Sequence, residues 1–186
     1  MLPSYPLVFG AGSADGVALA NSIVATSIMP PSSLAQIAGG ALQVGSYLQI
    51  TLFGRISTVV TTPGTLTLDL RLGGVIVSAF GAMALNVVAQ TNGTFEAVLR
   101  ARIGAIGSGT SALALCMGKF VSRALIGSPA TGAGDAPTRV LPDTAPANGT
   151  GFASATAVSV DVFATWSVAN AANSIQVHHA LVELKL

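Results

Sequence analysis

Apolar and polar residues alternate along several stretches of the chain, and this pattern constrains the fold more than any other feature. In residues 65–72, leucine occupies every even position and a polar residue every odd one. Successive side chains of a β-strand point to opposite faces, so a period of two predicts a strand with one buried face. Gly73-Gly74 and then Val75-Ile76-Val77 follow, which predicts a tight hairpin because glycine tolerates the positive φ angles of such turns.

Similar patterns predict further strands at residues 47–56, 95–103 and 158–166. Residues 111–120 are apolar at most positions, which predicts a strand buried on both faces. We find no convincing amphipathic helix, and turns rich in Gly, Pro and Ser separate the alternating stretches. These features predict an all-β fold, a two-sheet antiparallel sandwich of about eight strands.

The last predicted strand, residues 174–186, contains an irregularity. Its apolar residues lie at odd positions before His178-His179 and at even positions after that pair. One extra residue in a strand moves all later side chains to the other face, so the sequence predicts a β-bulge at the histidines.

Two regions do not follow the alternating pattern. Residues 1–45 are apolar, contain Pro and Gly, and predict an extended N-terminal arm with no core of its own, outside a sandwich domain formed by residues 46–186. Residues 127–154 are rich in Gly, Pro, Ala and Thr and predict a long loop, which is uncommon in a compact domain unless it is functional or disordered. We expect both regions to lie on neighbouring subunits.

The composition excludes several classes of protein. Only 8% of the 186 residues are charged, 51% are hydrophobic, and the formal net charge is +1. Disordered chains have the opposite composition, and the small net charge argues against nucleic-acid binding. Pro and Gly interrupt the uncharged stretches, which argues against spanning helices, and the start of the chain has no basic region typical of a signal peptide. We therefore expect an assembly, rather than a membrane, to cover the apolar surface.

Candidate catalytic and metal-binding residues are few. Cys116 is the only cysteine and lies in an apolar run, so we interpret it as a core residue. His178 and His179 are adjacent in a strand and should not bind one metal together. The glycines at 104–109 lack the lysine of a phosphate-binding loop and predict a turn.

The remaining charged residues also suggest no catalytic site. Nothing in the sequence pairs two carboxylates, so we expect them to be solvated or ion-paired. We expect the arginines on strand faces to form ion pairs within or between subunits. The sequence thus predicts no catalytic, cofactor-binding or metal-binding residues, and no enzyme. The carboxylates are Asp15, Asp69, Glu96, Asp135, Asp143, Asp161 and Glu183, and the strand arginines are Arg55, Arg71, Arg100 and Arg102.

Three segments give the chain a resemblance to a known group of proteins. The strand pair at 65–76, the strand at 95–103 and the closing pattern from Val160 to Leu184 resemble jelly-roll virion proteins of tailed bacteriophages. The resemblance covers roughly residues 46–126 and 155–186. It implies a jelly-roll sandwich, and a capsid decoration, cement or minor capsid protein without a catalytic motif, whereas the arm and the 127–154 loop have no counterpart in it.

The functional expectation follows from this resemblance and from the low charge. It is a homotrimer on the capsid surface, made in the host cytoplasm, that contacts the major capsid protein without nucleic acid, membrane or cofactor. We expect it to bridge capsomers through its arm, with the 127–154 loop as a second candidate. An alternative is a tail or fibre module that binds host glycan, for which the candidate aromatic residues are Trp166, Tyr47 and Phe163. A sugar-processing enzyme is a third hypothesis, but two adjacent histidines supply too few metal ligands.

Overall fold

The chain forms two antiparallel β-sheets that pack against each other. A computed structural model describes residues 7–12, 14–126 and 138–185. The larger sheet, sheet A, has seven strands. Its strands are, in hydrogen-bonded order, β1 (Leu7–Ala11), β12 (Ser174–Lys185), β5 (Tyr47–Thr58), β8 (Gln90–Ala105), β9 (Leu113–Ser122) and β10 (Thr138–Leu141), with β2 (Leu19–Ala20) beside part of β12.

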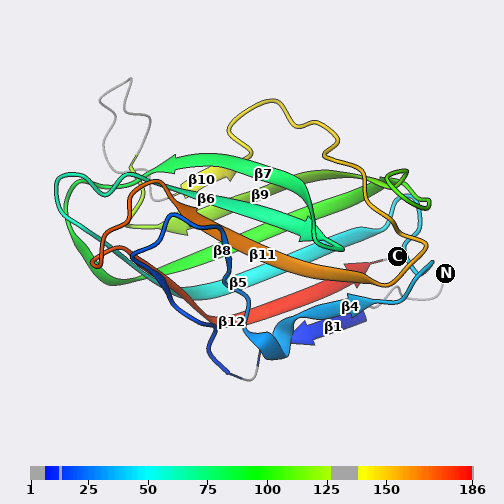
Figure 1. Ribbon diagram of the computed structural model, residues 1–186, viewed down its shortest axis with the longest axis horizontal. Coiled ribbons are helices and arrows are strands. Elements are labelled where there is room, and N and C mark those ends of the chain that lie inside the picture. The colour runs from blue at the N-terminus through cyan, green and yellow to red at the C-terminus, as the bar shows by residue number, and fades with distance from the viewer. Residues whose placement is uncertain (1–6, 13, 127–137, 186) are drawn as a thin grey trace.

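The smaller sheet, sheet B, has five strands and lies over sheet A in Figure 1. A short 3-10 helix, η1 (Pro31–Ser33), precedes one of them. The strands of sheet B are β3 (Thr26–Ser27), β11 (Val158–Trp166), β6 (Thr65–Leu72) and β7 (Val75–Ala84), with β4 (Ala35–Ile37) beside β11.

This architecture confirms the predicted all-β sandwich. The first two long strands pair with the last two, β5 with β12 and β6 with β11, which gives the fold a jelly-roll-like nesting. The predicted hairpin joins β6 to β7, and its glycines have positive φ angles of 60° at Gly73 and 82° at Gly74. Strands β5 to β12 agree with the expected number of about eight, whereas β1 to β4 come from the segment predicted to be an arm.

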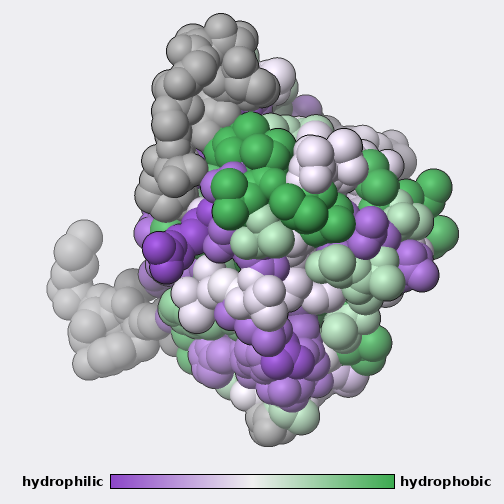
Figure 2. Space-filling view, turned by 90° about the vertical axis from the view of Figure 1, so that its left-hand side faces the viewer, coloured by the Kyte–Doolittle hydropathy of each residue, from purple (hydrophilic) through white to green (hydrophobic). Residues whose placement is uncertain are grey.

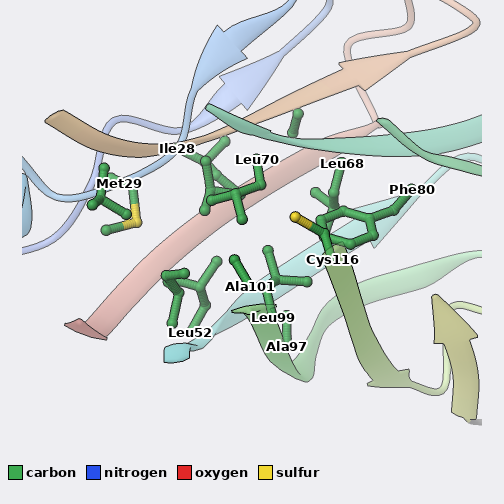
Figure 3. Packing of buried hydrophobic residues seen from close by; sticks show 14 of the residues in the cluster. Ile28, Met29, Leu52, Leu68, Leu70, Phe80, Ala97, Leu99, Ala101 and Cys116 are labelled. Carbon is green, nitrogen blue, oxygen red and sulfur yellow. The ribbon is translucent and has the colours of Figure 1, made fainter. Parts of the chain in front are cut away.

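The core fills the space between the sheets. In β11, the even-numbered residues from Val158 to Trp166, which are predicted to face inward, are all buried, and from Val160 onward they pair with the even-numbered leucines of β6. Figure 3 shows side chains from both sheets meeting there, among them Leu68 and Leu70 from sheet B and Leu52 and Leu99 from sheet A. Burial of this apolar surface is the main favourable contribution to folding, about 25 cal/mol per Å².

The predicted bulge in β12 is confirmed. The register between β12 and β5 shifts between Val177 and His179. Val177 and Ala180 are buried on either side of the bulge, and both histidines are exposed. The extra residue lets the apolar positions on both sides of the bulge face the core, although they differ in sequence parity.

The prediction that residues 111–120 are buried on both faces is wrong. Ala114, Cys116 and Phe120 of β9 face the core, but Met117 on the other face is 48% exposed. No element of the described chain covers that outer face, and Lys119 also lies on it. An apolar run in the sequence therefore marks one core face and one uncovered surface.

The prediction that the N-terminal segment is an arm without a core is also corrected. Residues 7–12 and 14–45 supply β1 to β4, which extend the edges of both sheets. Ile28 and Ile37 are fully buried in the main core, and Leu42 is nearly so. The described part of this segment is thus built into its own sandwich, because these side chains fill the gap at the sheet edges. Figure 1 shows it, in blue, running along the side of the sandwich.

Part of the predicted 127–154 loop likewise packs on its own chain, while residues 127–137 lie outside the described residues. Phe152 is buried and forms a bridge with Ala112. Gly149 approaches the edge of β7 so closely that a Cβ atom there would lie 1.6 Å from the carbonyl oxygen of Val77. The segment from 142 to 149 therefore covers an edge strand that would otherwise be open to pairing. Within the described residues, no helix is long and apolar enough to cross a membrane.

Candidate interaction surfaces

Cys116 lies in the core, as the sequence predicts. It points into the space between the sheets with Phe80 and Leu68 (Figure 3). Burial raises the pKa of its thiol to about 12. A thiol that stays protonated in an apolar environment is a poor nucleophile, so this residue has a packing role.

The two histidines have different partners. Nδ1 of His178 lies 2.9 Å from a carboxylate oxygen of Asp15, and the ring of His179 packs beside Phe53 at 6.1 Å between centroids. Among the described residues, no three histidine, cysteine, aspartate or glutamate side chains are grouped closely enough to hold a metal ion. The pair therefore connects the bulge to neighbouring segments.

A charged cluster lies on the outer face of sheet B. Arg71 contacts Asp69 at 3.6 Å and lies 3.6 Å above the ring of Phe163. Asp161 accepts a hydrogen bond of 2.7 Å from the hydroxyl of Ser27. Burial raises the pKa of both carboxyls above their ordinary value, and Arg71 offsets part of this increase. The cluster attaches β3 to β11 and β6, because Ser27, Asp161 and Arg71 lie in successive strands.

The other described carboxylates also have local partners, as expected, and Asp135 lies outside the described residues. Glu96 pairs with Lys119 at 3.8 Å. Asp143 pairs with Arg139, and Glu183 accepts a hydrogen bond from Gln49. The structure does not bring these groups together at one site.

The outer face of sheet A is the first of two surfaces that could bind a partner. Strand register places Glu183, Gln49, Arg100 and Met117 in one row across the sheet. The neighbouring rows place more cationic side chains on this face than anionic ones. The cations are Arg55, Arg100, Arg102, Lys119 and Lys185, and the anions are Glu96 and Glu183.

Two cations at the centre of this face are not neutralised. Within the described residues, Arg100 and Arg102 form no ion pair, and both are exposed. Beside Arg100, a shallow hollow of about 270 Å³ is lined by Val98, Met117, Gly118 and Lys119. Among the strand arginines, Arg71 forms an ion pair within the described residues and Arg55 donates hydrogen bonds to Gln176, while ion pairs between subunits stay a prediction. The face combines free positive charge with apolar surface.

The aromatic residues considered for glycan binding are poorly placed for it. Trp166 is buried in the core, and its indole nitrogen points to the carbonyl of Leu19 at 3.4 Å. The ring of Phe163 is covered by Arg71. Only Tyr47 lies on an open face, where it is half-buried beside Lys185.

The second surface is at one end of the sandwich, formed by residues 20–26, 57–64, 85–93 and 167–173, and we call it the loop end. These four segments contain no charged residue. Figure 2 looks onto this end and shows hydrophobic surface gathered above a more hydrophilic area. Arg123 lies at its margin, on the turn that follows β9. The exposed apolar residues of the loop end are Ile23, Val24, Val60, Val87, Val88 and Val168.

Buried polar contacts hold the loop end in place. Asn173 is fully buried, accepts a hydrogen bond of 2.9 Å from the amide of Val59, and donates one of 3.0 Å to the carbonyl of Pro63. The amide of Thr61 donates to the carbonyl of Val87 at 2.8 Å. These bonds connect three of the four segments, so the apolar side chains are presented by fixed loops.

A hollow of about 410 Å³ lies beside these valines. Its lining comes from the end of β5, the start of β8 and the connection between β11 and β12. The lining residues are Ser57, Thr58, Val59, Val60, Ala89, Gln90, Thr91, Ala171, Ala172 and Ser174.

Sequence reasoning missed both surfaces, although signals of each were present. The arginines were assigned to ion pairs because strand register, which sets their partners, was not known. The valines of the loop end are single residues in separate turns, and only the lack of charge in those turns pointed to them. No protein-family model and no curated protein matches the chain.

Proposed function

We propose that this chain is a structural virion protein, a decoration, cement or minor capsid protein that binds the head surface of a tailed phage as an oligomer. The observation that carries this proposal is the uncovered outer face of sheet A, with its free arginines and exposed apolar side chains. Arginine, methionine and aromatic residues are enriched in protein–protein interfaces, and this face contains all three. Its work is non-covalent, and we propose no catalytic role.

The outer face of sheet A, rather than the N-terminal segment, is the surface we assign to the capsid. The N-terminal segment contributes Ile28 and Ile37 to the core, so its described part is held on its own sandwich, although side chains such as Val17 remain exposed. Free Arg100 and Arg102 fit an acidic partner surface, while Met117 and Phe53 add apolar contact area. Opposite charges on the capsid would speed the encounter and fix its orientation.

The test uses capsid shells assembled from the major capsid protein of the phage that encodes this chain. The purified chain should sediment with these shells. The variant R100A/R102A should bind the shells at least about tenfold more weakly than the wild type, because two charge contacts are lost. The variant Q36E/T67E changes the net charge equally but on the side of sheet B, and it should bind as the wild type does. Failure of the wild-type chain to bind shells would contradict the proposal.

A further inference from the structure

We infer that the loop end is a self-association surface, through which copies of this chain join around a rotation axis. The partner is a second copy of the same chain. This inference rests on the proposed function, which expects an oligomer. It deepens that proposal by naming the surface through which the oligomer forms. Its test needs only the purified chain, so it can fail independently of capsid binding.

Charge is the first argument for a second copy as the partner. Copies related by a twofold axis bring the same surface patch of each copy into contact. Two outer faces of sheet A would place Arg100 and Arg102 of one copy against the same residues of the next, which repel. The four segments of the loop end contain no charge, so the loop end can meet itself without repulsion.

Size and hydrophobicity are the second argument. The loop end spans roughly 30 residues, similar to the 20–30 residues per side of a stable interface. Val60 is 57% exposed, Val87 53% and Val88 62%, so the most apolar side chains project from the surface. An exposed apolar patch framed by polar residues is typical of a protein contact. The segments carry no cation that could bind lipid headgroups.

Shape is the third argument. Val87 and Val88 are exposed and directly precede Ala89, which lines the hollow together with Val60 and Ala171. Exposed valines of one copy can enter the hollow of the next copy, with apolar side chains on both sides of the contact. Since Asn173 and the bond from Thr61 to Val87 fix the loops beforehand, little ordering is required on association.

Analytical ultracentrifugation of the full chain tests this inference. The wild-type chain should sediment as an oligomer. The variant Val88→Asp should raise the dissociation constant of self-association about 100-fold or more, because it would bury an unpaired charge. The matched control is Val44→Asp, which places the same charge at an exposed valine in the turn before β5, at the other end of the sandwich, and should keep the wild-type mass.

Circular dichroism spectra of both variants should match that of the wild type, which checks that the variants fold. The milder variant Val88→Ser covers the case in which the aspartate variant misfolds, and it should weaken association in the same direction. A monomeric wild-type chain, or a Val88→Asp oligomer as stable as the wild type, would overturn the inference. Binding of a monomeric wild-type chain to vesicles of neutral phosphatidylcholine would also overturn it, by showing a lipid partner at this end.

Discussion

The loop end and the outer face of sheet A are both exposed and partly apolar, but they differ in charge and in construction. The loop end is uncharged in all four of its segments, and its side chains project from turns held by buried hydrogen bonds. The outer face of sheet A lies on regular strands and carries Arg100 and Arg102 without ion-pair partners in the described chain. The first is suited to copies of itself and the second to a partner of opposite charge.

Under the proposed function, this difference gives a chain with so few charges two distinct kinds of contact. Apolar contacts are not directional, so an oligomer based on them needs a rigid surface of defined shape. Charges add orientation and favour one partner over another. The four segments of the loop end contain no charge, although Arg123 lies at their margin, and under the proposed function this would separate self-association from binding to a second protein.

The largest expected effect concerns the N-terminal segment, whose core residues support both surfaces. Ile28→Ser should lower the free energy of unfolding by about 3–5 kcal/mol, because it removes a fully buried side chain and buries a hydroxyl. Ile23→Ser, in the same segment but exposed at the loop end, should change stability by less than about 0.5 kcal/mol. Urea unfolding measures both. Equal effects would restore the idea of an arm without a core.

A smaller effect should follow from Asn173→Ala, which acts on the loop end alone. The variant leaves the amide of Val59 and the carbonyl of Pro63 without partners, which should cost about 2–3 kcal/mol of stability. Self-association should weaken with it, whereas shell binding per subunit should not change. Gln36→Ala, at an exposed position, serves as the control. Wild-type stability of the Asn173 variant would show that the loops do not depend on this residue.

Salt should separate the two surfaces. Raising the salt concentration from about 0.05 M to about 0.5 M screens exposed charges, so binding to capsid shells should weaken about tenfold. Self-association through the uncharged loop end should stay constant or strengthen over the same range. Light scattering of the chain measures how self-association depends on salt, and sedimentation with shells measures how capsid binding depends on salt. Parallel losses in both assays would mean that one surface serves both contacts.

The smallest effect concerns pH and the outer face of sheet B. Because burial raises the pKa of Asp161, its carboxyl group stays protonated to higher pH in the folded chain than in the unfolded chain. The contribution of this group to stability should therefore decline as pH rises above the ordinary carboxyl pKa of 3.8 toward the folded-state value. Asp161→Asn should remove that decline, and Ser27→Ala should steepen it by removing a hydrogen bond to the ionised form.

Thermal unfolding of these variants across this pH range measures the effect. An identical pH dependence for the wild type and Asp161→Asn would contradict it. Asp161→Asn should not alter self-association or shell binding, since Asp161 lies within β11, away from the two surfaces.

Local patterns predicted those parts of the fold that depend on neighbours in sequence. The hairpin at Gly73-Gly74 and the bulge at His178-His179 follow from alternation and turn chemistry within a few residues. The short strands of the N-terminal segment could not be predicted, because strands of two to five residues are too short to show a period. Their position is set by pairing with β11 and β12, far along the chain.

The candidate surfaces were harder to predict for the same reason. Val60, Val88 and Val168 are distant in sequence and meet only because sheet topology brings their loops to one end. The prediction for residues 111–120 is wrong because sequence alone does not show whether the second apolar face of a strand is covered by the same chain or stays exposed. The sequence did predict the buried Cys116 and the inward face of Val158–Trp166.

Electron cryo-microscopy of purified virions tests the central proposal most directly. We expect the two-sheet sandwich on the head surface, with the outer face of sheet A against the capsid and the loop ends of neighbouring copies meeting around an axis. The account would be contradicted if the chain were missing from the virion, or if the outer face of sheet A pointed to solvent in the assembled particle.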